Sequence, residues 1–207
     1  MSHAFTILER DLQSSGASAI VLEMLAASIE DERRHAEQCR RLAVRYAGAE
    51  VAIGHVDAPV LPAFEGAETK TRAALRVTAM CCINETLATV WLKACFDRSV
   101  SPLARSANRL HLREEMSHAR LGWAHLASPF VTPEMKRAIA ARLPRLLDAN
   151  VPQWYAEETA DVPPEGFPDH GVLSTEETRG LILAAVAEVV LPGFDEVGIQ
   201  VAWSVRP

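Results

Sequence analysis

The chain has 207 residues, of which 49% are hydrophobic and 23% are charged, and its formal net charge is −6. This length and apolar content suit a single domain over residues 1–207 with a sizeable core. Aromatic residues make up only 6%, and alanine and leucine are abundant, which predicts an all-α fold. The acidic balance, without a long run of lysine or arginine, excludes a nucleic-acid-binding surface.

The sequence also predicts a cytoplasmic protein that does not enter a membrane. The first residues lack the basic and apolar regions of a secretory signal. The most apolar run, Leu181 to Pro192, contains Glu188 and is too short to span a bilayer. Cysteines at positions 39, 81, 82 and 95 show no metal-finger spacing and no small-domain disulfide density, so we expect reduced thiols.

Hydrophobic periodicity and helix-terminating residues divide the chain into helices and connections. The first four helices are expected to form a core within residues 1–127, and two accessory helices follow within 128–207. Glycines and prolines between 48 and 68 predict a connection long enough to run back along the core. The predicted helices cover residues 4–13, 18–47, 68–97, 101–127, a fifth from 132 that Pro144 kinks and Pro152 interrupts, and 174–192.

Two short segments carry the metal-binding chemistry. Asp31-Glu32-Arg33-Arg34-His35 and Glu114-Glu115-Met116-Ser117-His118 each contain Glu-x-x-His, and helical residues three apart share one face. Two such pairs, with glutamates from two further helices, form the ligand set of carboxylate-bridged dimetal bundles. The predicted metal ligands are Glu32, His35, Glu85, Glu115 and His118.

The position of Glu85 fits this site. The third and fourth helices turn near Val100, and Glu85 and Glu115 lie equally far before and after that turn. Antiparallel helices joined by a tight turn bring such residues to the same height. We therefore expect the two carboxylates to lie side by side.

The same reasoning finds no carboxylate on the first helix. The position level with Glu32 falls near Ser2 and His3, where no acid stands. Four explanations remain open: a site with five protein ligands, substitution by His3, a ligand from another helix, or a natural chain that begins upstream. Glu188 is the candidate from another helix, and its alternative is an ordinary glutamate that pairs with an arginine or faces solvent.

Carboxylate and imidazole ligands suit two irons, or manganese with iron, and leave positions where dioxygen can bind. A metal-bound histidine also needs an acceptor for its second ring nitrogen. Asp31 and Glu114 directly precede the ligand glutamates, and we predict that each accepts a hydrogen bond from the histidine of the opposite pair. Asn84 should face a neighbouring helix. Four further residues could extend the lining of the site: Cys39, Cys81, His111 and His125. The alternative for each is an ordinary role in the core or on the surface.

The two motifs resemble those of the ferritin-like di-iron carboxylate superfamily. The run from Asp31 to Cys39, with a cysteine one turn after the histidine, is similar to the corresponding helix of bacterial multicomponent monooxygenase hydroxylases. His118-Ala-Arg-Leu-Gly-Trp123 resembles a segment of uncharacterised bacterial ferritin-like proteins. The resemblance covers residues 1–127 and implies a ferritin-like four-helix bundle with a long crossover between parallel second and third helices. Ribonucleotide reductase small subunits carry a radical tyrosine where Cys39 stands, so no stored tyrosyl radical is expected.

Three functions fit these observations. The favoured one is a non-haem di-iron oxygenase or oxidase that uses O2 to oxidise a small organic substrate, with an electron-donor protein and with the helices after residue 128 walling the substrate pocket. The second is ferroxidase, peroxide-scavenging or iron-storage chemistry. The third is a metal-free, non-enzymatic bundle, which the missing carboxylate favours and the retained Asp31 and Glu114 oppose. The sequence identifies no catalytic residue beyond the ligands, and a homodimer is the assembly considered.

Overall fold

The computed structural model describes residues 2–52, 54, 61–156, 163 and 165–203. Within these ranges the regular elements are helical, which confirms the all-α prediction, and one isolated β-bridge joins Phe167 to Val172. The elements are α1 (Ser2–Ser15), α2 (Ala19–Ala47), α3 (Thr69–Val77), η1 (Thr78–Glu85), α4 (Thr86–Arg98), α5 (Pro102–Ala127), α6 (Pro133–Ala140), α7 (Leu143–Asn150), η2 (Val151–Trp154), η4 (Pro168–His170), α8 (Thr175–Ala185), η5 (Val186–Val190) and α9 (Leu191–Glu196).

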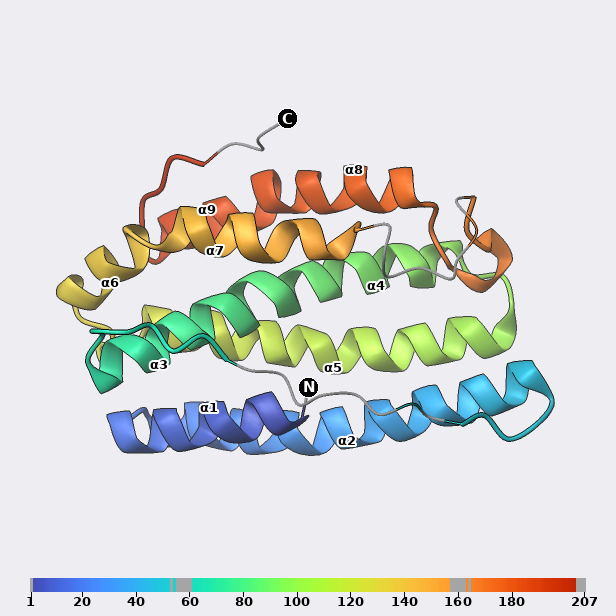
Figure 1. Ribbon diagram of the computed structural model, residues 1–207, viewed down its shortest axis with the longest axis horizontal. Helices are drawn as coiled ribbons and strands as arrows, with labels where there is room; N and C mark the ends of the chain where they lie inside the picture. The colour runs from blue at the N-terminus through green and yellow to red at the C-terminus, as the bar shows by residue number, and fades with distance from the viewer. Residues whose placement is uncertain (1, 53, 55–60, 157–162, 164, 204–207) are drawn as a thin grey trace.

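The helices lie in three layers (Figure 1). The antiparallel pair α1 and α2 forms one outer layer, and α5 and the continuous helix α3–η1–α4 form the middle layer. The C-terminal helices α6 to α9 form the third layer and pack against α3, η1 and α4. Because α2 and α3–α4 run in the same direction, the chain returns along the bundle between Gly48 and Glu68.

Local sequence signals set most helix ends. The Ser18 hydroxyl accepts a hydrogen bond from the Val21 amide at the start of α2, and Gly48 ends that helix with a φ of 68°. Ser174 and Glu177 form a capping box at the start of α8. The predicted stop at Pro192 is wrong, since α9 continues to Glu196. The preceding segment η5 is a π-helical turn, whose wider spacing relieves the clash between a proline ring and the carbonyl one turn earlier.

The middle of the third core helix is also π-helical, which the sequence did not predict. Side chains satisfy carbonyls in and around the wide segment η1: Thr78 Oγ1 donates to Ala74 O at 2.8 Å, and Asn84 Nδ2 donates to Ala79 O at 3.0 Å. A π turn shifts the phase of the side chains that follow it by about one residue, roughly 100°. The segment ends at Glu85 and therefore sets the direction of this side chain.

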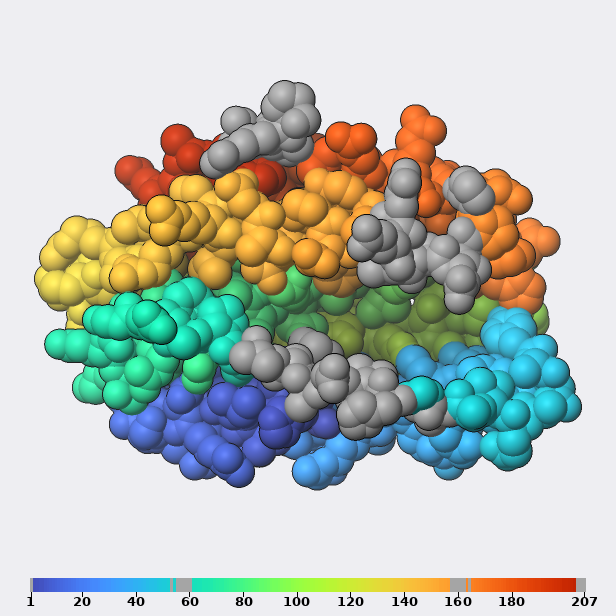
Figure 2. Space-filling view, in the orientation of Figure 1, coloured from blue at the N-terminus to red at the C-terminus, as the bar shows by residue number. Residues whose placement is uncertain are grey.

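The hydrophobic core runs through all three layers. Phe5, Leu8 and Leu12, spaced three and four residues apart on one face of α1, are fully buried. In Figure 2 the green helices α4 and α5 show only as a narrow band between the blue N-terminal and the orange C-terminal helices. No described helix combines the length and apolar character needed to cross a membrane.

Candidate metal centre

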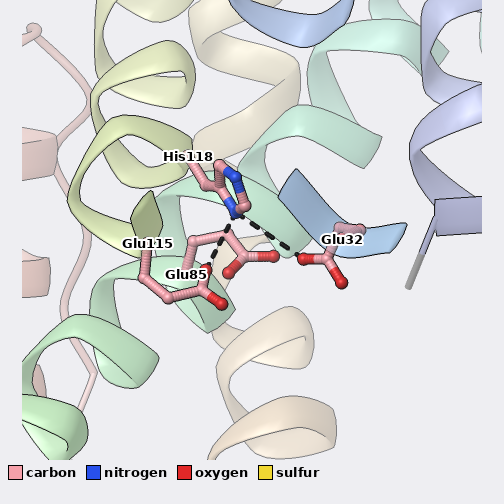
Figure 3. Close-up of side chains that lie close together, drawn as sticks. All are labelled: Glu32, Glu85, Glu115 and His118. Carbon is pink, nitrogen blue, oxygen red and sulfur yellow. Dashed lines mark hydrogen bonds and ion pairs between the residues drawn. The ribbon is translucent and has the colours of Figure 1, made fainter. Parts of the chain in front are cut away.

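Four of the predicted ligands meet at the centre of the bundle (Figure 3). Glu32 comes from α2, Glu85 from the end of η1, and Glu115 and His118 from α5. One ligand atom from each of the four lies within 4.8 Å of the others, and all four side chains are buried. This group could hold a metal ion, and the carboxylates of Glu85 and Glu115 lie side by side as expected.

Glu115 lies between the two histidines of the motifs. Its Oε2 atom is 2.9 Å from His118 Nδ1, and its Oε1 atom is 3.3 Å from His35 Nδ1. The two imidazole rings have their centroids 5.9 Å apart. The fifth predicted ligand, His35, thus adjoins the four-residue group through the second oxygen of Glu115, and one carboxylate faces two imidazole nitrogens.

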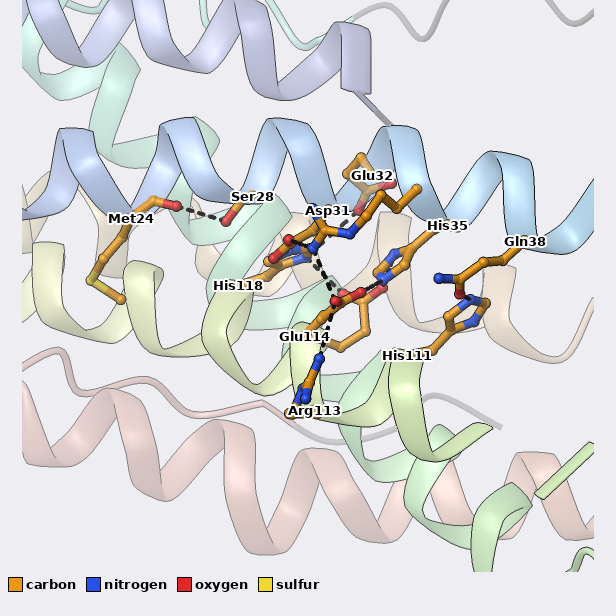
Figure 4. A network of polar contacts seen from close by, with 12 residues as sticks. Met24, Ser28, Asp31, Glu32, His35, Gln38, His111, Arg113, Glu114 and His118 are labelled. Atoms are coloured by element: carbon orange, nitrogen blue, oxygen red, sulfur yellow. Dashed lines mark hydrogen bonds and ion pairs between the residues drawn. The ribbon is translucent and has the colours of Figure 1, made fainter. Parts of the chain in front are cut away.

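The opposite nitrogen of each imidazole contacts the acid predicted for it (Figure 4). His35 Nε2 lies 2.8 Å from Glu114 Oε2, and His118 Nε2 lies 3.3 Å from Asp31 Oδ2. An ionised carboxylate only accepts hydrogen bonds, so Nε2 of each ring carries a hydrogen. When the ring is neutral, Nδ1 is then bare and free to bind a metal ion. The predicted cross-pairing of Asp31 and Glu114 with the opposite histidines is confirmed.

Arg34 joins these two outer acids. Its guanidinium bonds to Asp31 and lies 2.9 Å from Glu114 Oε1. Burial opposes ionisation of Glu114, but hydrogen bonds from Arg34 and His35 outweigh it and lower the pKa of this carboxyl. Glu114 therefore stays an acceptor for the His35 ring.

In the metal-free protein, protons take the place of positive ions among the central groups. Burial, followed by the nearby Glu115 charge, raises the pKa of Glu85 well above its ordinary value, and the same causes raise the pKa of Glu32. Burial alone would raise the pKa of Glu115, but hydrogen bonds from His118, His35 and Glu85 lower it. The site thus holds protons that bound cations would displace.

The two histidines show the complementary effect. Burial favours the neutral imidazole, but the Glu115 carboxylate outweighs it and raises the pKa of both His35 and His118. Three carboxylates and two imidazoles are ligands that iron, manganese and zinc accept. The buried group of Glu32, Glu85, Glu115 and His118 could therefore hold a divalent metal ion, and His35 lies beside it.

A cavity of about 680 Å³ adjoins the donor groups. Glu32, His35, Glu85 and Glu115 form one part of its wall. Apolar and aromatic side chains from α4, η2 and the segment before α8 form most of the rest, including Trp91, Leu92, Trp154, Tyr155 and Leu173. The C-terminal elements thus wall a pocket beside the site, as the sequence analysis expected of them.

The structure does not bring the two further candidate ligands to the site. His3 lies on the exposed side of α1, two residues and about 200° from the inward-facing Phe5. Glu188 in η5 is also exposed, so the alternative of a solvent-facing glutamate is correct. The α1 side chain that reaches the centre is Phe5, whose ring lies edge-on to His118 with centroids 5.4 Å apart.

The other candidate residues divide between the cavity and the core. Cys39 and His111 line the cavity, and His111 Nε2 lies 2.8 Å from Gln38 Oε1. Cys81 is fully buried beneath Gly122 of α5. His125 is buried, and neither ring nitrogen has a hydrogen-bond partner among the described residues.

Asn84 faces the C-terminal layer, as predicted. Its Nδ2 atom donates to Asn150 Oδ1 at 2.7 Å, and its Oδ1 accepts from Trp154 Nε1 at 3.1 Å. Sequence reasoning did not identify Trp154, Tyr155 or Phe5 as neighbours of the site. The sequence signal that could have pointed to two of them is the pair of adjacent aromatic residues, Trp154 and Tyr155, in a chain that is poor in aromatic residues.

Comparisons with protein-family models, curated proteins and solved structures find no match to this chain. The ferritin-like resemblance therefore stays a prediction carried by the motifs.

Proposed function

We propose that this chain is a ferritin-like, dimetal-carboxylate oxidoreductase that uses O2 to oxidise a small organic substrate. The observation that carries the proposal is the direct contact between the donor groups and a half-open, largely apolar cavity. Pockets of a few hundred Å³ with apolar walls and a few polar groups are typical of small-molecule sites. Here the polar groups include four of the proposed ligands, Glu32, His35, Glu85 and Glu115.

The arrangement around Glu115 supports two ions in place of one. Its two oxygens each face a different imidazole nitrogen, at 2.9 Å and 3.3 Å. A carboxylate of this kind can bridge two ions, with Glu32 and Glu85 completing the carboxylate set. Two irons, or manganese and iron, bound there would supply the electrons and the open positions for O2 chemistry.

The residues of the chain have separable tasks. Asp31 and Glu114 hold the Nε2 hydrogens of the two histidines, which fixes the tautomer that turns Nδ1 inward. Phe5 and its buried neighbours on α1 exclude water from one side of the site. On the other side, Trp91, Trp154 and Tyr155 provide aromatic surface against which an organic substrate can pack. Electrons would come from a separate donor protein.

The cavity wall argues against iron as the substrate. The carboxylates that line it, among the described residues, are Glu32, Glu85 and Glu115, and all three belong to the donor set. Within the described lining, no further acids form a path that would lead a hydrated iron ion through the cavity. An apolar approach of this kind favours an organic molecule over a metal ion.

The proposal is tested first by metal content and then by O2 uptake. Protein expressed with iron and manganese supplied should contain close to two metal ions per chain by mass spectrometry. Metal-free protein reloaded anaerobically with Fe(II) should consume O2 and keep its iron bound. Close to zero metal after reloading would support the metal-free bundle, and repeated oxidation of added Fe(II) with release of Fe(III) would support the ferroxidase alternative.

A further inference from the structure

Two sides of the donor set differ sharply in the described part of the chain. On the α1 side, Phe5 is fully buried against the His118 ring, and Ala4 and Leu8 beside it are also buried. An apolar helix face therefore occupies the position from which a fourth carboxylate was sought. On the opposite side, Glu32, Glu85 and Glu115 line the cavity. Among the described residues, the cavity is therefore the space from which a further ligand can reach the ions.

Two divalent ions leave an excess of positive charge on this donor set. The three carboxylates are Glu32, Glu85 and Glu115, and the two histidines bind as neutral imidazoles. Three negative charges do not neutralise two doubly charged cations. The outer acids, Asp31 and Glu114, share the Arg34 guanidinium, which offsets part of their own charge. Three carboxylates and two imidazoles also supply fewer donor atoms than two octahedral ions require.

The described part of the cavity wall is poor in permanent positive charge. Its described lining contains no lysine or arginine. The surface away from the ligands is formed by side chains such as Trp91, Leu92, Trp154 and Leu173. A ligand that fits both ends would have an apolar or aromatic body and one anionic head.

We propose that the cavity takes a small carboxylic acid with an apolar or aromatic body, and that its carboxylate supplies the ligand that the first helix lacks. This inference rests on the proposed function, because it needs metal ions at the site. It adds the chemical class of the substrate and the end by which it binds. Without lysine or arginine in the described lining, the preference for an acid depends on the metal.

The test compares acids with their uncharged amides by calorimetry and by tryptophan fluorescence, since Trp91 and Trp154 line the cavity. The probes are phenylacetate and phenylacetamide, decanoate and decanamide, and acetate and acetamide, the last pair small enough to enter whatever the cavity's shape. Manganese-loaded protein should bind at least one acid about tenfold or more tightly than its amide. Metal-free protein should lose this preference.

Two variants distinguish the contribution of the ligand's apolar body to binding from that of its carboxylate. Ala88 lines the cavity on α4, and Ala88→Phe should weaken phenylacetate binding about tenfold or more while acetate binding and metal content stay unchanged. Ala124 is exposed on α5 and does not line the cavity, so Ala124→Phe is the size-matched control and should change neither.

The outcomes distinguish the two proposals. If the protein binds no metal, both fail. If metal binds but every acid and its amide bind equally, the inference about the substrate fails and the proposed function stands. An acid preference that persists undiminished in metal-free protein would likewise overturn the inference, because another group would then recognise the carboxylate.

Discussion

Glu115 is the residue on which the geometry of the centre depends most. Its two oxygens face His118 and His35, and its charge raises the pKa of Glu32 and Glu85. Glu115→Ala should therefore lose at least one of the two expected metal ions, measured as metal content per chain. Cys39→Ser is the matched control, because Cys39 lines the same cavity without belonging to the donor set. Unchanged metal content in Glu115→Ala, or loss of both ions in Cys39→Ser, would contradict this assignment.

A substitution of Glu114 tests whether the outer acids, Asp31 and Glu114, support metal binding by orienting the histidine rings. Its carboxylate is buried and 2.8 Å from His35 Nε2. Glu114→Ala removes the acceptor that orients the ring, and metal affinity should fall about 10- to 100-fold, measured by competition with a chelator. Glu176→Ala is the control, since Glu176 is exposed at the start of α8. Equal affinities in the two variants would mean that Glu114 has no positioning role.

At the scale of single residues, the sequence predicted the chemistry well. The i, i+3 spacing of a helix places Glu32 beside His35 and Glu115 beside His118 whatever the rest of the fold does. Phe5 could not be placed in this way, because its contact with His118 depends on how α1 sits against α5. Sequence patterns also do not predict which residues of η2 and of the segment before α8 line the cavity, because these residues are far from the motifs in sequence.

Among the elements, η1 is the one that most shapes the site. Helix periodicity predicted a single regular helix over 68–97, and the structure has a π-helical segment within it that ends at Glu85. No residue preference marks such a turn. It is stabilised by tertiary contacts, among them the close approach of Cys81 and Cys82 to Gly122 on α5. The sequence predicted where the helix lies, but not the direction in which the side chains of its second half point.

Gly122 makes that close approach possible. A Cβ atom at this position would lie 2.6 Å from Cys81 Cβ, 2.8 Å from Cys82 Sγ and 3.0 Å from the Cys81 carbonyl carbon. Gly122→Ala should therefore cost about 1–3 kcal/mol of unfolding free energy by overpacking, measured by denaturant unfolding of the metal-free protein. Gly180→Ala in α8 has nothing within 4 Å of the added atom and should be neutral or gain up to about 1 kcal/mol. A neutral Gly122→Ala would show that η1 can move away from α5 freely.

Considered as a whole, the molecule consists of a motif-bearing bundle and a C-terminal layer that covers it. The layer contacts α3, η1 and α4 and walls the cavity beside the donor groups. Sequence patterns predicted the helices of this layer but not the surface that they cover, because that depends on packing between distant segments. The layer's hydrogen bonds to Asn84, next to Glu85, join it directly to the centre.

The centre should also determine how the stability of the metal-free protein varies with pH. The pKa values of Glu85 and Glu32 are raised above the ordinary 4.5, and those of His35 and His118 above the ordinary 6.5. A group with a raised folded-state pKa contributes stability below its ordinary pKa, and this contribution is lost as the pH rises through the folded-state value. The four shifts have the same sign, so each lowers stability as the pH rises. The two histidines, whose ordinary pKa is 6.5, and Glu85, whose pKa is raised well above 4.5, extend this loss to alkaline pH.

We accordingly expect the thermal midpoint of chelator-treated protein to fall as the pH rises from about 6.5 towards 9. Burial lowers the pKa of His125 to about 4. A lowered histidine pKa reduces stability as the pH falls below the ordinary value of 6.5, so His125 does not contribute to the alkaline loss. Glu85→Gln keeps the shape of the side chain and removes its titration, so it should reduce the alkaline loss. Metal-loaded protein, whose cations replace the protons, should lose much less stability over the same range. An alkaline loss of equal size in all three samples would mean that the central carboxylates and imidazoles do not govern the stability of the fold.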